Sequence, residues 1–145
     1  MAKKPLISAA IRAKLEGARV AHLATLDGKR KPHLVPICFA CKGSVFYSAV
    51  DRKPKRVAPK RLARLKNISR TPEVALLVDH YDEDWTRLWY VLVRGEAELV
   101  TGPAERKMAI ECLRAKYPQY TPEMLEDDAP VLRITPERVT AWGNI

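Results

Sequence analysis

The feature that most constrains this fold is a succession of short strands joined by tight turns. Asp27-Gly28 is a strong β-hairpin signal, and Lys42-Gly43 marks the next turn. The predicted strands are residues 19–26, 32–39, 44–48, 73–79, 89–100 and 131–142. No strand–helix–strand alternation and no glycine-rich fingerprint follow the first strand, which disfavours a dinucleotide-binding parallel sheet.

Three helices are expected around these strands. Apolar spacing predicts the first over 6–16, with Ser8 as its cap and Gly17 at its end. The second is a short amphipathic helix at 60–69, and the third begins at Pro103 and runs to about residue 116. The order predicts a mostly β, α+β fold, an antiparallel barrel that is closed or nearly closed, with Pro36 on an edge strand or a bulge. A chain of 145 residues is the size of one domain, here 1–145.

Positive charge is concentrated in one segment. The chain carries a net charge of +9, and residues 51–70 alone hold nine basic residues and one acidic residue. Five of these nine are arginines, which bind phosphate and carboxylate groups through paired N–H donors. We therefore expect this segment to face an anionic partner, although such a run can also be a solvated helix face.

Nucleic acid is an alternative anionic partner for this basic segment. The predicted helix at 60–69 is short, and no second helix completes a helix-turn-helix. A protein that binds single-stranded nucleic acid needs aromatic residues interleaved with the basic ones, and this segment has none. We therefore expect no specific nucleic-acid partner, and keep non-specific binding as an alternative.

Other classes of site have weaker signals. Cys38 and Cys41 form a C-x-x-C at the end of a predicted strand, where the two thiols point to opposite faces, and no second pair completes a zinc site. His33 and His80 are candidates to line a pocket, whereas His22 is expected in the sheet. We expect no metal, no membrane span and, with three cysteines and no export signal, a cytoplasmic location.

Several motifs together carry a family resemblance. Val45-Phe46-Tyr47-Ser48 is followed by the basic segment and then by Asn67-Ile68-Ser69-Arg70-Thr71-Pro72-Glu73-Val74. In this order and spacing they resemble the split-barrel flavin-binding superfamily named after pyridoxamine 5'-phosphate oxidase, and the opening hairpin fits the same pattern. The basic run at 51–56 and the stretches 77–85, 88–91 and 136–143 are similar to its subgroup of F420-dependent, or deazaflavin-dependent, oxidoreductases.

The resemblance implies a homodimer of split barrels that holds a flavin or deazaflavin in a groove at the subunit interface. It implies an enzyme that transfers a hydride from reduced F420 to a small unsaturated organic substrate. The net charge of the basic segment agrees with this ligand, because F420 carries a phosphodiester and a tail of glutamates. FMN is the alternative cofactor, but with one phosphate it leaves most of these cations unexplained.

Cofactor-binding residues are transferred from the family motif position by position. The strand containing Val35, Pro36 and Ile37 would lie along the ring system. Tyr47 and Ser48 match positions that touch the ring or the ribityl chain, and Trp89 and Tyr90 match a strand position near the ring edge. The anionic groups would be held by Lys53, Lys55, Arg56 and Arg64, with Asn67 supporting the helix or its contacts.

The chain also departs from the family. It has no C-terminal arginine–histidine substrate motif, so vitamin B6 oxidation is not expected. The basic segment is longer than in compact members, which leaves open which of its cations replaces the usual phosphate lysine. No catalytic acid is assigned, and the substrate is not specified. An FMN-dependent oxidoreductase and a carrier that binds F420 without turnover remain alternatives.

Overall fold

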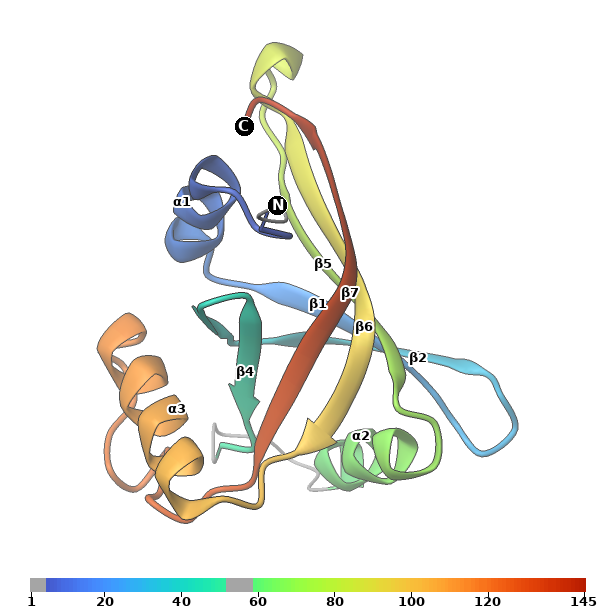
Figure 1. Ribbon diagram of the computed structural model, residues 1–145, viewed down its shortest axis with the longest axis vertical. Helices are drawn as coiled ribbons and strands as arrows, with labels where there is room; N and C mark the ends of the chain where they lie inside the picture. The colour runs from blue at the N-terminus through green and yellow to red at the C-terminus, as the bar shows by residue number, and fades with distance from the viewer. Residues whose placement is uncertain (1–4, 52–58) are drawn as a thin grey trace.

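The computed structural model describes residues 5–51 and 59–145, with side chains from residue 63 onward in the second range. It contains one strongly curled antiparallel sheet with helices around it (Figure 1). The helices are α1 (Ala9–Gly17), α2 (Pro59–Arg70) and α3 (Pro103–Lys116), with the short 3-10 helix η1 (Trp85–Arg87). The strands are β1 (Ala21–Leu26), β2 (Pro32–Ile37), β3 (Ala40–Lys42), β4 (Val45–Ala49), β5 (Glu73–His80), β6 (Trp89–Leu99) and β7 (Val131–Gly143).

The strands are hydrogen-bonded in the order β2-β1-β5-β6-β7-β4-β3, and every neighbouring pair is antiparallel. β2 and β3 form the two edges, although only residues 38–39 separate them along the chain. The sheet therefore curls so that its two ends approach each other. This is the predicted antiparallel split barrel, and Pro36 lies on an edge strand, where a residue without an N–H is tolerated.

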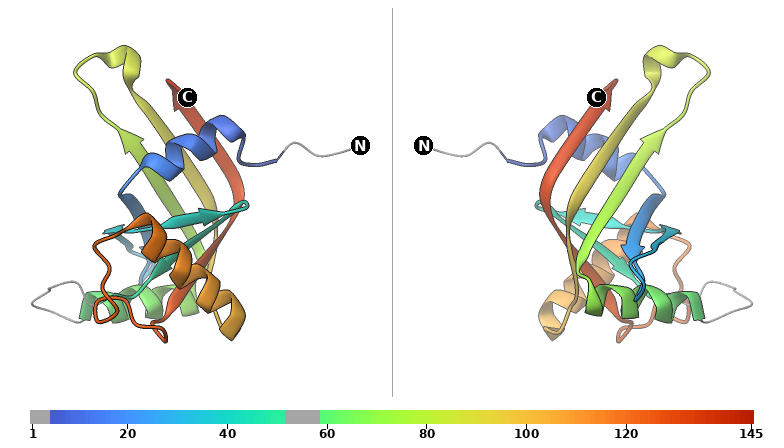
Figure 2. Two further views of the ribbon diagram at one scale, coloured as in Figure 1. Left: turned by 90° about the vertical axis from the view of Figure 1, so that its left-hand side faces the viewer. Right: turned by 90° about the vertical axis from the view of Figure 1, so that its right-hand side faces the viewer.

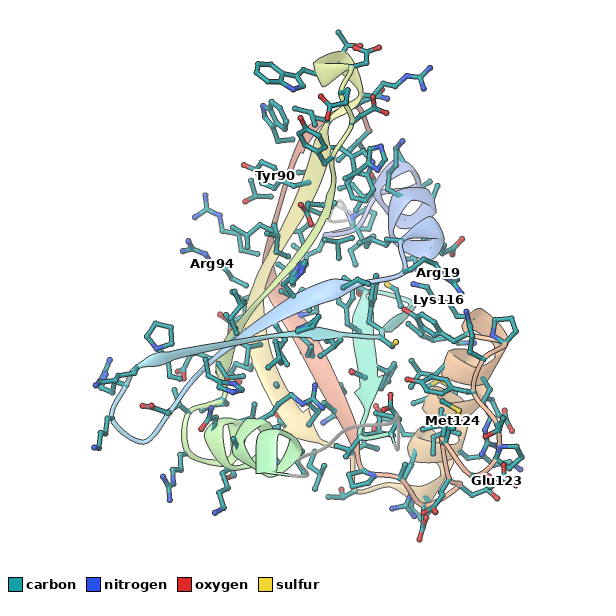
Figure 3. All side chains as sticks on the ribbon, turned by 180° about the vertical axis from the view of Figure 1, so that it is seen from behind. Arg19, Tyr90, Arg94, Lys116, Glu123 and Met124 are labelled. Atoms are coloured by element: carbon teal, nitrogen blue, oxygen red, sulfur yellow. The ribbon has the colours of Figure 1, made fainter. Side chains whose placement is uncertain are left out.

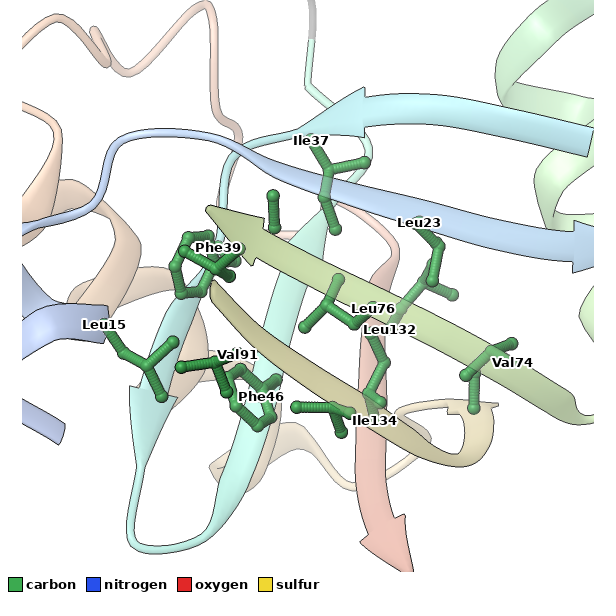
Figure 4. Close-up of a cluster of buried hydrophobic side chains, with 14 of the residues drawn as sticks. Leu15, Leu23, Ile37, Phe39, Phe46, Val74, Leu76, Val91, Leu132 and Ile134 are labelled. Atoms are coloured by element: carbon green, nitrogen blue, oxygen red, sulfur yellow. The ribbon is translucent and has the colours of Figure 1, made fainter. Parts of the chain in front are cut away.

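Two apolar clusters stabilise this arrangement. The first fills the inside of the curl, where Leu23, Phe46 and Leu76 are fully buried (Figure 4). The second lies between the sheet and α3 and includes Ile110 and Leu113. Burying these side chains on both faces of β4 fixes which of its residues are available to a ligand.

Each helix covers a different part of the sheet. α2 packs on β1 and β6, α3 packs on β3, β4 and β7, and α1 contacts β3 (Figure 2). α1 and α2 thus lie near opposite ends of the long β5–β6 hairpin (Figure 1). Among residues 5–51 and 59–145, no helix has the length and apolar character needed to span a bilayer.

The largest differences from the sequence predictions are at the start of α1 and at β3. α1 begins at Ala9 rather than at residue 6, because Ser8 accepts a hydrogen bond from the Ile11 N–H at 3.2 Å and caps the helix there. The three-residue strand β3 was not predicted, because a segment this short has no detectable periodicity. β7 is continuous through Pro136, and its pairing with β6 has a register shift between Arg94 and Gly95.

Candidate functional site

The basic helix α2 is fixed to the sheet by a buried polar contact. Asn67 donates a hydrogen bond from Nδ2 to Oγ1 of Thr25 on β1 at 3.0 Å, and both side chains are buried. Leu65 and Ile68 pack into the first apolar cluster on the same side of the helix. Arg64, one turn before Ile68, is also buried. The helix therefore has a fixed orientation relative to β1.

The side of α2 that faces away from the sheet carries exposed cations, and these continue toward the β1–β2 hairpin. Lys66 and Arg70 are exposed. A Cβ at Gly28 would lie 2.6 Å from the Arg70 guanidinium, so Arg70 reaches the hairpin turn that carries Lys29, Arg30 and Lys31. The predicted phosphate-binding residues Lys53, Lys55 and Arg56 lie outside the described residues, directly before the start of α2.

A partnerless ring nitrogen lies beside the Thr25–Asn67 contact. His33 on β2 is the register partner of Thr25, so the two side chains share a face of the sheet. Within the described part of the chain, Nδ1 of His33 is buried and makes no hydrogen bond. Buried polar atoms normally have partners, which makes this atom a candidate ligand contact.

The predicted ring-binding strand leads from this region toward β4. Val35 is half-buried and packs on the first apolar cluster, Pro36 is exposed, and Ile37 is buried in that cluster. Ser48 is buried and donates a hydrogen bond to the carbonyl oxygen of Cys38 at 2.8 Å. The structure thus brings the end of β2 together with Ser48.

Tyr47 lies on the other face of β4, under α3. Its hydroxyl donates to Glu105 at 2.7 Å, and Glu105 also accepts a hydrogen bond from Arg133 at 2.6 Å. Burial, followed by the contact with Glu105, raises the pKa of Tyr47 to about 12. The same contacts with Tyr47 and Arg133 lower the pKa of Glu105. Tyr47 is therefore a neutral donor whose hydroxyl is occupied by Glu105.

Trp89 and Tyr90 lie far from α2 within one chain. α2 lies against the C-terminal end of β6, from Glu96 onward. Trp89 is seven residues earlier, about 23 Å along the strand. It stacks on His80 with ring centroids 6.2 Å apart, whereas Tyr90 points to the opposite face and stacks on Trp142 at 5.7 Å. Figure 3 labels Tyr90 at this distal end.

Tyr90 belongs to an apolar surface on the outer face of the sheet. Trp142 is 52% exposed and Leu34 is 66% exposed, and Leu77 and Leu92 are half-buried between them. The strand registers place Leu77 beside Leu92 and Tyr90 beside Trp142. Large exposed apolar patches commonly mark interaction surfaces.

A groove of about 490 Å³ separates α2 from β6, but its chemistry does not suit a polyanion. Glu96 and Glu98 line it, opposite Leu65 and Ile68. The cationic side of α2 is thus the better candidate surface. No cluster of three or more histidine, cysteine or acidic side chains suited to a metal occurs in the described parts of the chain.

Sequence reasoning missed the polar partners that α3 and its following loop supply. Glu105 was not considered, and neither was the half-buried contact between the Tyr120 hydroxyl and Asp51 at 2.5 Å. These partners are 58 and 69 residues apart, and no local pattern links them. Burial, followed by the hydrogen bond to Asp51, raises the pKa of Tyr120.

Comparison with known proteins identifies related sequences and folds. The family model described as pyridoxamine 5'-phosphate oxidase matches residues 7–143, which is nearly the whole chain. A search of curated proteins finds no match. Among solved structures, a conserved hypothetical protein from Mycobacterium tuberculosis has a TM-score of 0.76 at 22% identity, over 99% of this chain and 89% of that chain.

Two further structures have names that mention a cofactor. An F420 reductase has a TM-score of 0.65 at 24% identity, over 89% of this chain and 94% of that chain. An FAD-binding protein from Mesorhizobium loti has a TM-score of 0.67 at 22% identity, over 93% and 94%. Proteins described as binding or storing heme also match. At these identities the similarity supports the shared fold alone.

Proposed function

The chain belongs to the pyridoxamine 5'-phosphate oxidase family, and from this premise we propose that it is an F420-dependent oxidoreductase. Its substrate would be a small unsaturated organic molecule. The bound deazaflavin would supply the hydride, and the chain would supply binding, orientation and charge. Three free cysteines are consistent with a reducing compartment, and we propose a cytoplasmic location.

The observation that carries this proposal is the charge around α2. Nine basic residues and one acidic residue occupy 51–70, and the exposed Lys66 and Arg70 continue toward the basic hairpin turn. A phosphodiester with a glutamate tail offers several anionic groups to such a surface, whereas FMN offers one phosphate. F420 is therefore the ligand whose charge best matches this surface.

The residues near α2 fit a cofactor of this kind. Thr25 and Asn67 hold the helix against the sheet, and Nδ1 of His33 is a buried atom in need of a hydrogen bond. We propose that Val35, Pro36 and Ile37 line the ring and that Ser48 lies at its ribityl side. Lys53, Lys55, Arg56 and Arg64 would bind the anionic groups, and Asn67 would position α2. Tyr47 would contribute ring or backbone contacts, because Glu105 occupies its hydroxyl.

A second copy of the chain is part of the proposal. Trp89 and Tyr90 are about 20 Å or more from α2 along β6, so one chain does not bring them to the same ligand. A homodimer formed through the outer face, where Trp142 and Leu34 are exposed, would cover this apolar surface. The Tyr90 side chain of one subunit would then approach the cofactor of the other, whereas Trp89, on the opposite face of β6, would support this strand from inside.

Two alternative functions are compatible with the same fold. An FMN-dependent oxidoreductase is favoured by the family to which the chain belongs and by the FAD-binding structural relative. A carrier that binds F420 without turnover is consistent with the lack of an assigned proton donor. The two alternatives differ from the main proposal in ligand preference and in turnover, respectively.

A titration of the purified chain with F420, FMN and hemin at low and moderate salt tests these choices. We expect F420 to bind most tightly and to weaken with salt, because exposed charge pairs are screened. A triple variant, Lys53→Gln with Lys55→Gln and Arg56→Gln, should lower F420 affinity by at least about tenfold. The matched control, Lys42→Gln with Arg106→Gln and Lys107→Gln, removes the same charge elsewhere and should not.

The outcomes separate the candidates. A preference for FMN would move the function to an ordinary flavin, and hemin binding alone would reject both flavin and deazaflavin chemistry. Tight F420 binding without hydride transfer to any conjugated acceptor would favour the carrier. Equal effects of the triple variant and its control would remove the basic segment from the cofactor site.

A further inference from the structure

A second groove lies at the other end of the molecule, between α1 and the sheet. It has a volume of about 480 Å³. It lies at the connection between α1 and β1, beside the end of β5 and the start of β6. Small-molecule sites are commonly of this size. None of the described residues of α2 lines this groove, so it is separate from the described part of the surface proposed for F420.

One wall of this α1 groove is positively charged. Lys14 and Arg19 line it from α1 and the turn that follows. The Lys14 Nζ lies 5.8 Å from the centroid of the Trp89 ring, and the Arg19 guanidinium lies 4.7 Å from the centroid of the Tyr117 ring. Within the described residues, neither cation is in an ion pair with a carboxylate. Both can therefore accept an external anion.

A third cation, Lys116, strengthens the positive potential next to Arg19. Lys116 at the end of α3 lies 5.6 Å from the same Tyr117 ring that Arg19 covers, and Figure 3 labels the two cations side by side. Lys116 donates a hydrogen bond to the Leu15 carbonyl oxygen at 3.1 Å. Burial, followed by repulsion from Arg19, lowers the pKa of Lys116 to about 8. An anion near Arg19 would reduce this repulsion.

The facing wall is aromatic, and the aspartate side chains near it lie next to histidines. His80 and Trp89 stack with an interplanar angle of 17°; Trp89 is buried, so the accessible ring of this pair is that of His80. His22 lies 3.9 Å from Asp79, and the carboxylate of Asp82 lies 3.6 Å from His80. The carboxylates on this side are thus next to imidazoles, whereas neither cation opposite has a carboxylate partner among the described residues.

We propose that the α1 groove binds a small planar aromatic carboxylate. The ring of the ligand would lie against the His80–Trp89 stack, where offset stacking is favourable. Its carboxylate would be held by Lys14 and Arg19 through charge-assisted hydrogen bonds. This binding does not depend on the proposed cofactor, since among the described residues the groove shares only Trp89 with the predicted cofactor contacts.

Isothermal titration calorimetry on the full chain without added cofactor tests the proposal. The probes are 2-naphthoate and its uncharged analogue 2-naphthamide, which has the same ring. We expect 2-naphthoate to bind about tenfold more tightly than the amide, and less tightly as salt is added. The Lys14→Gln, Arg19→Gln double variant should lose about this tenfold preference, and the control Lys42→Gln should keep it.

The aromatic half of the groove has its own variant. His80 is exposed enough for His80→Ala to fold, and this change should weaken both probes to a similar degree. Failure of both probes to bind would overturn the proposal, as would equal affinity for the two. If Lys14 and Arg19 serve only the carbonyl end of α1, the double variant would lower stability and leave naphthoate binding unchanged, which would also refute it.

Discussion

Replacing Thr25 by valine tests how α2 is held in the orientation that the proposed cofactor site needs. Thr25 is 2% exposed and Asn67 is 6% exposed, and their hydrogen bond is 3.0 Å long. Valine keeps the branched shape and nearly the same volume but removes the Oγ1 acceptor. The Nδ2 group of Asn67 then loses the Thr25 acceptor in a buried setting.

The size of the effect follows from two opposing contributions. Stranding a buried donor costs about 1–3 kcal/mol, and this is the main term. The added methyl group in the apolar core and the favourable strand propensity of valine offset part of this cost, on the order of 0.5 kcal/mol. We therefore expect Thr25→Val to lower the unfolding free energy by about 1–2 kcal/mol. For a domain of this size that corresponds to a drop of about 3–6 °C in Tm.

The assay is thermal and urea unfolding of the wild type, Thr25→Val, Asn67→Ala and the double variant. Thr135→Val is the matched control, because Thr135 is an exposed threonine on β7 away from the proposed dimer surface, and it should stay within about 0.5 kcal/mol of the wild type. The double-mutant cycle should give a coupling of about 1 kcal/mol. Because Asn67 orients α2, we also expect Thr25→Val to weaken F420 binding.

An unchanged Tm for Thr25→Val would refute the anchoring role, and so would strictly additive effects in the cycle. If stability falls while ligand affinity is unaffected, the contact is structural and α2 does not need it to present its cations. Each of these results is measurable without knowledge of the substrate.

Three other changes test the packing that surrounds the site. Gly95→Ala should destabilise by about 3 kcal/mol or more in urea unfolding, because its Cβ would overlap the backbone of Thr135 across β7. Tyr47→Phe should cost about 1–2 kcal/mol in thermal unfolding by removing the bond to Glu105, while changing F420 affinity less than twofold. Lys116→Met tests a pH effect: the folded pKa is about 8 and the ordinary value is 10.5, so the unfolded chain binds more protons between these values. The wild type should therefore gain stability relative to Lys116→Met between pH 7.5 and pH 9.5, measured by urea midpoints.

Local signals in the sequence predicted most of the elements. The cap at Ser8, the hairpin at Asp27-Gly28 and the start of α3 at Pro103 all depend on residues within one turn of each other, and the structure confirms them. β3 was missed because three residues carry no periodic pattern. The strand order and the curl depend on pairings between distant segments, and there the family resemblance supplied what periodicity did not.

The candidate site was less accessible to sequence reasoning. Strand alternation predicts that Tyr47 and Ser48 face opposite sides, but it does not say which side is covered. The answer depends on α3, whose Glu105 binds Tyr47 from 58 positions away. Likewise, the contact between Asn67 and Thr25 joins a helix to a strand 42 positions apart. Long-range polar partners of this kind have no local signature.

The same alternation gives Trp89 and Tyr90 different roles. Trp89 faces inward, stacks on His80 and lines the α1 groove, whereas Tyr90 faces outward against Trp142 on the exposed apolar surface. A single flat ligand bound to one chain therefore does not touch both side chains. If Tyr90 contacts the cofactor, that cofactor belongs to a second subunit docked on the outer face. If Trp89 contacts a ligand in its own chain, that ligand lies in the α1 groove. Mutating each residue alone should consequently affect different ligands.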